Sequence, residues 1–161
     1  MSLKVNLLWD SPDDVRNGYV NFDEHAPIPD QAGRIKASVQ NLDHFVEAGE
    51  ADEIVSNDIL NYLSADEGDA ALTNWLSKLA HGGKLCVSVV DVREVSKKCL
   101  ANVITIEDTN VLLHGDQEKP HRFRKTSFTL PLLIEVFTNR GFKVLTKRIQ
   151  NSRAVIVVER P

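Results

Sequence analysis

The sequence is poor in cysteine, which excludes a disulfide-dense secreted scaffold. Two cysteines occur among 161 residues, too few for a framework of paired bridges. Cys86 lies within an apolar run, where a cysteine usually behaves as a small buried residue. Cys99 follows two lysines, but the sequence offers it no catalytic partner. Neither cysteine is predicted to act as a nucleophile.

Long apolar segments are absent as well. No run approaches the roughly 20 residues that a membrane-spanning helix needs. Residues 1–4 lead directly into a short apolar run, which is unlike a secretory signal peptide. We therefore expect a cytoplasmic protein without a membrane partner.

The chain also lacks a strong charge of one sign. It carries 19 basic and 23 acidic residues, a formal net charge of −4, so a nucleic-acid partner is not expected. One basic cluster occurs between residues 119 and 125. That cluster is either a solvated loop, the commoner case, or a patch for an anionic substrate. Its members are Lys119, His121, Arg122, Arg124 and Lys125.

Motifs for metals, phosphates and nucleophilic catalysis are not found. The five histidines show no metal-ligand spacing, although His114, Asp116 and His121 fall in one predicted loop. Gly82-Gly83 follows a helical pattern and precedes a strand, the reverse of a phosphate-binding loop. No serine-histidine-aspartate elbow occurs. We predict no metal site.

The most informative segment that is present runs from residue 51 to residue 91. A short strand predicted at 53–56 is followed by a helical pattern at 69–80, a Gly-Gly turn and an apolar run at 84–90. This apolar run is nearly continuous, which is typical of a strand covered on both faces. This order predicts a parallel β-α-β crossover. Polar residues follow both strands, at the edge where open α/β sheets bind ligands.

The remaining patterns complete one α/β domain over residues 1–161, with seven strands and three or four helices. Only nine residues separate Trp9 from Tyr19, fewer than the dozen or so that a helical crossover needs. The first crossover helix is therefore predicted to be shortened or missing. Residues 102–117 are ambiguous between the two patterns. Strands are predicted at 4–9, 19–23 and 34–39, a terminal hairpin at 142–149 and 153–159, and helical segments at 42–48, 92–100 and 129–140.

Three stretches resemble the class I S-adenosylmethionine-dependent methyltransferases. Residues 52–63 resemble the family pattern D-E-I-x-x-S-x-x-L-x-x-L, and Gly82-Gly83-Lys84-Leu85 resembles P-G-G-x-L. Residues 18–23, Gly-Tyr-Val-Asn-Phe-Asp, match G-Y-x-N-x-D. The resemblance implies a Rossmann-like methyltransferase fold, a mostly parallel seven-stranded sheet with a C-terminal antiparallel hairpin.

The resemblance also implies a cofactor, S-adenosylmethionine, and residues around it. Asp23, beside Glu24, falls where the family binds the cofactor ribose with an acid; the alternative is a turn or cap residue. Asp58 would act as a catalytic base toward the acceptor, or would cap the next helix, which we favour. The cofactor-binding set is Leu8, Trp9, Asp10, Asp23, Glu24, Gln40, Asn41, Asn57 and Asp58, and the substrate-lid set is Tyr62, His121, Arg122 and Arg124.

The first strand departs from the family pattern. Family members place glycines after it, so that the backbone can approach the cofactor closely. This chain has Leu8-Trp9-Asp10-Ser11-Pro12 there, and its first glycine is Gly18. The indole of Trp9 would obstruct the usual pocket unless it swings away. The family's G-D-L after the third strand is also replaced here, by Gln40-Asn41-Leu42, polar residues that either contact adenine or form a turn.

Two functions follow as expectations. The first is methyl transfer from S-adenosylmethionine to an unidentified small-molecule or macromolecular acceptor. The second is a catalytically inactive binding or assembly module with a decayed cofactor pocket, in which Trp9 fills the cofactor space. An apolar surface within 103–113 would then serve a homo-oligomer or another partner. A nucleotide-binding protein of another Rossmann-like type is the weaker third reading, because no dinucleotide fingerprint occurs.

Overall fold

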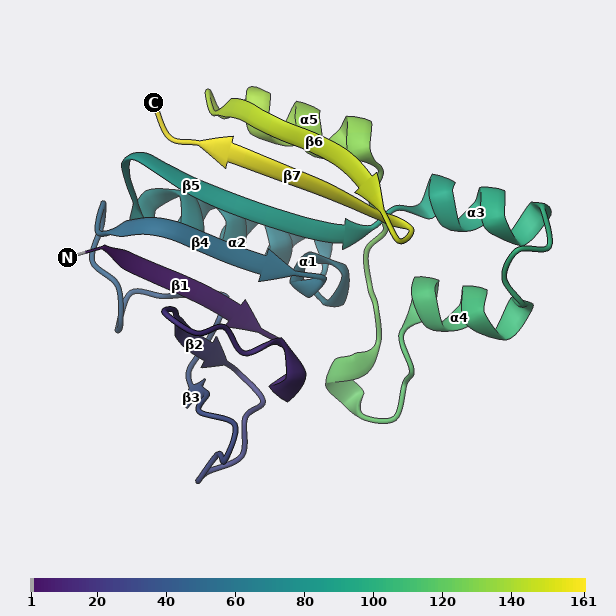
Figure 1. Cartoon of the computed structure of the whole chain (residues 1–161), viewed down its shortest axis with the longest axis horizontal. Coiled ribbons are helices and arrows are strands. Elements are labelled where there is room, and N and C mark those ends of the chain that lie inside the picture. The colour runs from purple at the N-terminus through teal and green to yellow at the C-terminus, as the bar shows by residue number, and fades with distance from the viewer. Residues whose placement is uncertain (1) are drawn as a thin grey trace.

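A computed structural model describes residues 2–161 of the chain (Figure 1). Within that range, seven strands form one sheet in the order β3-β2-β1-β4-β5-β7-β6. All pairs are parallel except those of β7, which runs antiparallel to β5 and to β6. The predicted fold class is therefore confirmed. The strands are β1 (Leu3–Leu8), β2 (Val20–Asp23), β3 (Ile35–Lys36), β4 (Ala51–Asn57), β5 (Leu79–Val90), β6 (Lys143–Gln150) and β7 (Arg153–Glu159).

The helix between β4 and β5 forms for local reasons that the sequence displays. Its first turn is closed by a capping box, in which Ser64 and Glu67 each bind the other's backbone amide. Its apolar face reaches Trp75, which has no exposed surface and donates from Nε1 to the Val39 carbonyl at 2.7 Å. The helices are α1 (Ile59–Tyr62), α2 (Ala65–Lys78), α3 (Val92–Leu100), α4 (Ile106–His114) and α5 (Leu130–Thr138), with short 3₁₀ turns η1 (Pro12–Asp14) and η2 (Pro120–Arg122).

Several predicted elements need correction. Residues 42–48 form turns rather than helical turns, and residues 102–117 contain α4, whose capping residue is Thr105. The predicted third strand at 34–39 pairs only over Ile35–Lys36. β5 begins at Leu79 instead of residue 84, because the Gly82-Gly83 segment stays in the sheet through a register shift against β4.

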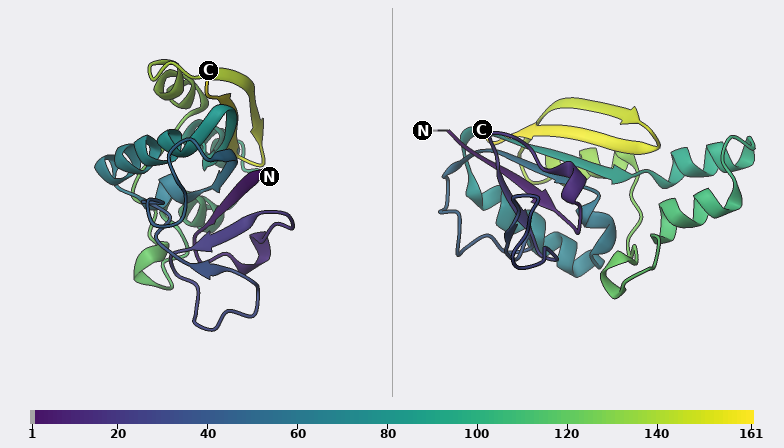
Figure 2. Two further views of the ribbon diagram at one scale, coloured as in Figure 1. Left: turned by 90° about the vertical axis from the view of Figure 1, so that its left-hand side faces the viewer. Right: turned by 60° about the horizontal axis from the view of Figure 1, so that its bottom comes forward.

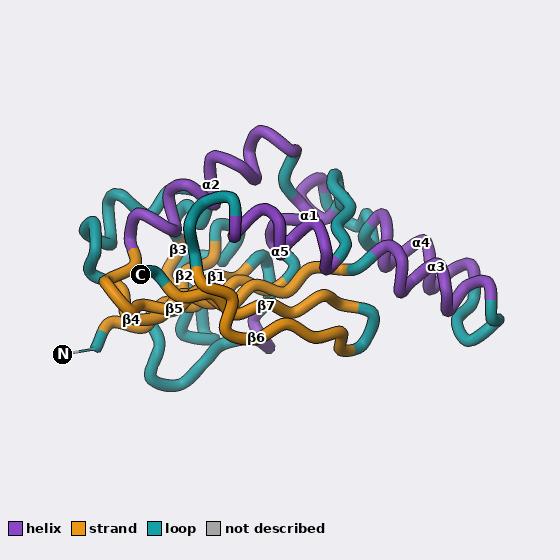
Figure 3. The backbone as a smooth tube through the Cα atoms, turned by 90° about the horizontal axis from the view of Figure 1, so that it is seen from above, coloured by secondary structure: helices purple, strands orange, loops and turns teal. Residues whose placement is uncertain are grey.

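One face of the sheet lacks a helical cover. In Figure 3, α1, α2 and α5 lie on the same side of the sheet. The first crossover, from β1 to β2, contains only η1, as its length predicted. The prediction that β5 is covered on both faces is therefore wrong. Leu85, Val87 and Val89 are fully buried on the helix side, whereas Cys86 alternates with them and is half-buried on the other face, called the open face below.

Helices α3 and α4 form an arm that projects beyond the sheet (Figure 2). They pack on each other, and several large apolar side chains on them stay exposed. Among residues 2–161, no helix combines the length and apolar character needed to cross a bilayer. The exposed apolar residues of the arm and its connecting turn are Leu100, Val103, Ile106 and Val111.

Candidate functional site

The carboxyl ends of β1, β2, β4 and β5 meet at one edge of the sheet, and each is followed by or ends in an aspartate. Asp10 and Asp58 adopt left-handed backbone conformations, with φ of 53° and 60°, an arrangement that is uncommon outside glycine and concentrates at functional turns. Asp23 is the last residue of β2 and Asp91 caps α3. In parallel sheets this edge is where ligands bind. We call it the strand-end site.

Asp23 is fully buried, and the chain itself uses all of its hydrogen-bonding capacity. Its Oδ1 accepts from the backbone amides of Asp10 (2.9 Å) and His25 (2.9 Å). Its Oδ2 accepts from the amide of Ser11 (3.1 Å) and from Arg34 Nη1 (2.8 Å), whose side chain is also buried. The turn after β1, where the family has glycines, is thus held by the Asp23 carboxylate. This leaves Asp23 no acceptor for a ribose hydroxyl.

The carboxylate of Glu24 accepts longer hydrogen bonds than that of Asp23. Its side chain accepts only long hydrogen bonds, from Gln40 Nε2 at 3.3 Å and from the Val39 amide at 3.4 Å, near the limit of useful geometry. The Oδ1 of Asn41, in contrast, accepts from Asn74 of α2 at 3.4 Å and from the Asp43 amide at 2.9 Å. Gln40 and Glu24 are therefore the two predicted cofactor residues of this side that the structure brings together.

The indole of Trp9 lies at the centre of the strand-end site. It stacks on Tyr62, with ring centroids 5.9 Å apart and planes at 11°, and meets His25 edge-on at 4.5 Å. Its Nε1 donates to the His121 carbonyl at 2.6 Å. The rings of His25 and His121 stack at 3.7 Å. Burial, and then the neighbouring His121, lower the pKa of His25, so its ring is neutral at pH 7.

Asp10 anchors the segment that crosses this edge, residues 115–128, which we call the lid segment. Its Oδ2 lies 2.9 Å from His121 Nε2, 3.0 Å from Lys119 Nζ and 3.1 Å from Arg122 Nη2. Burial raises the pKa of Asp10, but the hydrogen bonds from His121, Lys119 and Arg122 outweigh it and hold that pKa well below its usual range. The basic cluster of the sequence is therefore a set of contacts within the chain.

Asp58 anchors the lid segment from the other side. Arg153 binds it through both Nε (2.9 Å to Oδ1) and Nη2 (2.7 Å to Oδ2), and Arg124 Nη2 lies 3.2 Å from Oδ2. The guanidinium of Arg124 also lies 4.8 Å from the Tyr62 ring centroid. Although Asp58 occupies the N-cap of α1, its side chain makes no capping hydrogen bond. The favoured capping interpretation is therefore wrong, because the carboxylate is used in ion pairs instead.

Three residues of the site were not among those predicted from the sequence. Arg153 reaches Asp58 because the sheet order brings together segments that are 95 residues apart. Arg34 lies only 11 residues from Asp23 and reaches it from the connection between β2 and β3. Asn61 is buried; its backbone carbonyl accepts from the amides of Lys125 and Thr126, and its side-chain Nδ2 donates to the Thr126 carbonyl, so it fixes the lid segment. No local motif marks these roles.

The other predicted residues lie elsewhere. Leu8 is buried in the core, and Asn57 Oδ1 accepts from Ser88 Oγ on the open face. Two nitrogens at the strand-end site, His25 Nε2 and Arg124 Nε, are buried without a hydrogen-bond partner within residues 2–161. Such orphaned groups are uncommon and call for an explanation.

No family model matches the sequence, and no curated protein does. Solved structures do match. A SAM-dependent methyltransferase from Methanosarcina mazei shares a TM-score of 0.62 and 13% identity, over 99% of this chain and 92% of that one. The 1,6-didemethyltoxoflavin-N1-methyltransferase of Burkholderia thailandensis, solved with 1,6-didemethyltoxoflavin and S-adenosylhomocysteine, has a TM-score of 0.62 and 12% identity, over 98% and 72%.

A larger solved structure matches the same fold over a smaller part of both chains. An O-methyltransferase family protein from Burkholderia thailandensis has a TM-score of 0.53 and 17% identity. The match covers 79% of this chain but only 35% of that protein, so this chain spans about a third of its length. At these identities the likeness concerns the fold.

Proposed function

We propose that this chain, which has the fold of the class I S-adenosylmethionine-dependent methyltransferases, binds S-adenosylmethionine at its strand-end site and methylates a small-molecule acceptor. The observation that carries the proposal is the orphaned buried nitrogen His25 Nε2, at the edge where this fold binds ligands. A neighbour of the same fold is described with S-adenosylhomocysteine bound. The cofactor would supply the methyl group, and the protein would supply proximity and orientation.

The residues present fit the cofactor only after the lid segment moves. Trp9 and His121 fill the space above β1, and their hydrogen bond ties the lid segment down. Glu24, rather than Asp23, is then the carboxylate free to accept the ribose hydroxyls, because its present hydrogen bonds are long. Gln40, which already lies beside Glu24, would contact adenine. Once Arg124 has left it, Asp58 would accept a proton from the acceptor through the lone pairs that Arg153 does not occupy.

One observation favours a second candidate, a non-catalytic binding or assembly module. The buried ion pair of Asp23 and Arg34, at 2.8 Å, occupies the carboxylate that the family uses for its cofactor. In that case Trp9 is a permanent part of the core, and the lid segment never opens. The fold alone does not decide between the two candidates.

Isothermal titration with S-adenosylmethionine and with S-adenosylhomocysteine tests both candidates. The methyltransferase proposal expects micromolar binding of either ligand. Glu24→Gln should weaken it at least about tenfold, the usual cost of a charged hydrogen-bond partner. Glu47→Gln is the matched control, because Glu47 is exposed and this substitution removes the same charge at a position away from the site. An absence of heat and of any melting shift at millimolar ligand would instead support the non-catalytic module.

A further inference from the structure

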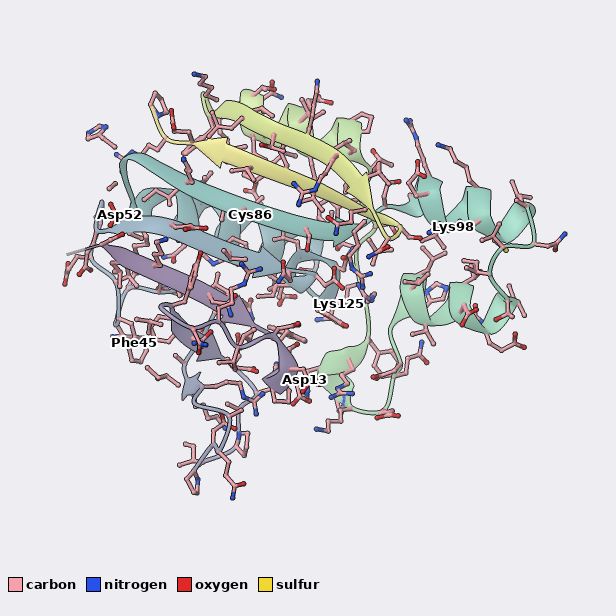
Figure 4. All side chains as sticks on the ribbon, in the orientation of Figure 1. Asp13, Phe45, Asp52, Cys86, Lys98 and Lys125 are labelled. Carbon is pink, nitrogen blue, oxygen red and sulfur yellow. The ribbon has the colours of Figure 1, made fainter. Side chains whose placement is uncertain are left out.

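The open face of the sheet carries a pocket of about 320 Å³, which exists because no crossover helix covers β4 and β5 on that side. Figure 4 labels Cys86, which lies on β5 in the middle of the sheet. Ser88 follows it two residues along the same face. Pockets that hold small molecules begin at about this volume. The walls include Arg16, Asn57, Cys86, Ser88, Arg148 and Arg153.

The pocket carries an excess of positive charge. Within residues 2–161, no carboxylate lies within ion-pair distance of Arg16 or Arg148. Arg153 pairs with one carboxylate, that of Asp58, which also pairs with Arg124. Burial raises the pKa of the Cys86 thiol, so the sulfur stays neutral and does not offset the arginines. Glu53, an acid whose charge acts on Cys86, is paired with Lys4 at 3.5 Å.

Hydrogen-bond donors also outnumber acceptors in the pocket. The Oδ1 of Asn57 accepts from Ser88 Oγ at 3.1 Å, which leaves the Asn57 amide nitrogen to donate. Arg148 donates from Nε to Gln150 Oε1 at 3.2 Å, which leaves both of its terminal nitrogens. A ligand that satisfies these groups must present several acceptor oxygens and negative charge.

We propose that this open-face pocket binds the phosphoryl group of a small phosphorylated molecule. Two unpaired guanidinium groups suit a phosphoryl dianion, because the planar fork of arginine matches its oxygens two at a time. The volume of about 320 Å³ limits the ligand to a small molecule. The proposal does not depend on methyl transfer: the pocket meets the strand-end site at Arg153, which binds Asp58, but Arg16 and Arg148 belong to the pocket alone.

Titration of the full chain with inorganic phosphate and with ribose 5-phosphate, at constant ionic strength, tests the pocket. We expect saturable binding of the ester at millimolar or lower concentration. Arg148→Gln and Arg16→Gln should each weaken it at least about tenfold, as the loss of a charged hydrogen bond does. Arg148→Lys should weaken it less than Arg148→Gln, because it keeps the charge and loses only the fork.

Arg93→Gln is the matched control, because Arg93 is exposed on α3 and its loss changes the net charge equally. Arg16 and Arg148 are exposed as well, so these variants should keep the wild-type melting temperature. Equal affinity for phosphate and for the ester would assign the pocket to free phosphate, and tighter binding of the ester would assign a phosphorylated molecule. Binding that does not saturate, or that is equally strong in Arg148→Gln and Arg93→Gln, would overturn the proposal.

Discussion

The connection from β4 to β5 and the connection from β1 to β2 are stabilised by different interactions. The β4-to-β5 connection contains the 14-residue helix α2, whose apolar face reaches the fully buried Trp75. The β1-to-β2 connection contains a single 3₁₀ turn, and the turn before it is tied to the buried carboxylate of Asp23. Burial of apolar surface stabilises the first, while charge and hydrogen bonds fix the second.

The two tryptophans give the largest test of this contrast. Trp75→Ala should lower the free energy of unfolding by about 3–5 kcal/mol, because it empties a fully buried site and leaves the Val39 carbonyl without its donor. Trp9→Ala should cost clearly less, since the indole is only partly buried. Urea unfolding of both variants measures the difference. An equal loss in the two would mean that Trp9 belongs to the permanent core, as the non-catalytic module requires.

The second largest effect is expected at Asp23. Asp23→Ala leaves Arg34 buried without one of its partners and frees the amides of Asp10 and Ser11, so it should destabilise the fold by roughly 3–5 kcal/mol. Arg34 also binds the buried carboxylate of Asp30 at 2.9 Å, so the triple variant Asp23→Ala, Asp30→Asn and Arg34→Met removes all three charges and should recover part of that loss. Equilibrium unfolding tests both variants. If the triple variant is no more stable than Asp23→Ala alone, the ion pairs are not what holds this turn.

The contrast also explains how far the sequence could predict this molecule. α2 and β5 followed from apolar spacing, and the missing first helix followed from the length of the connection between Trp9 and Tyr19. The position of the strand-end site could be predicted from the sequence, but its ion pairs could not. Asp23 pairs with Arg34, and Asp58 pairs with Arg153. Arg153 lies 95 residues from Asp58 in sequence, and only the antiparallel β7 brings it close. Local patterns do not encode such contacts.

A smaller effect is expected from acid. The pKa of His25 is lowered by burial and by His121, so the unfolded chain takes up its proton first as the pH falls below about 6.5. Stability should therefore decrease from pH 7 toward the folded-state pKa of His25. Melting temperatures at pH 7 and pH 5 should differ less in His25→Phe than in the wild type. His44→Phe, at an exposed histidine, is the control and should keep the wild-type difference.

The smallest effect concerns the lid segment itself. Arg122 shares Asp10 with His121 and Lys119, and its side chain is partly exposed, so Arg122→Gln should cost at most about 1 kcal/mol of folding stability. The same change weakens the closed state, and if closure competes with the cofactor, affinity for S-adenosylhomocysteine should rise by up to about fivefold. Arg93→Gln, which removes the same charge outside the lid segment, should leave that affinity unchanged. Calorimetry on the two variants separates the candidates, because a gain confined to Arg122→Gln requires a lid segment that opens, whereas equal affinities would leave the strand-end site a closed structural element.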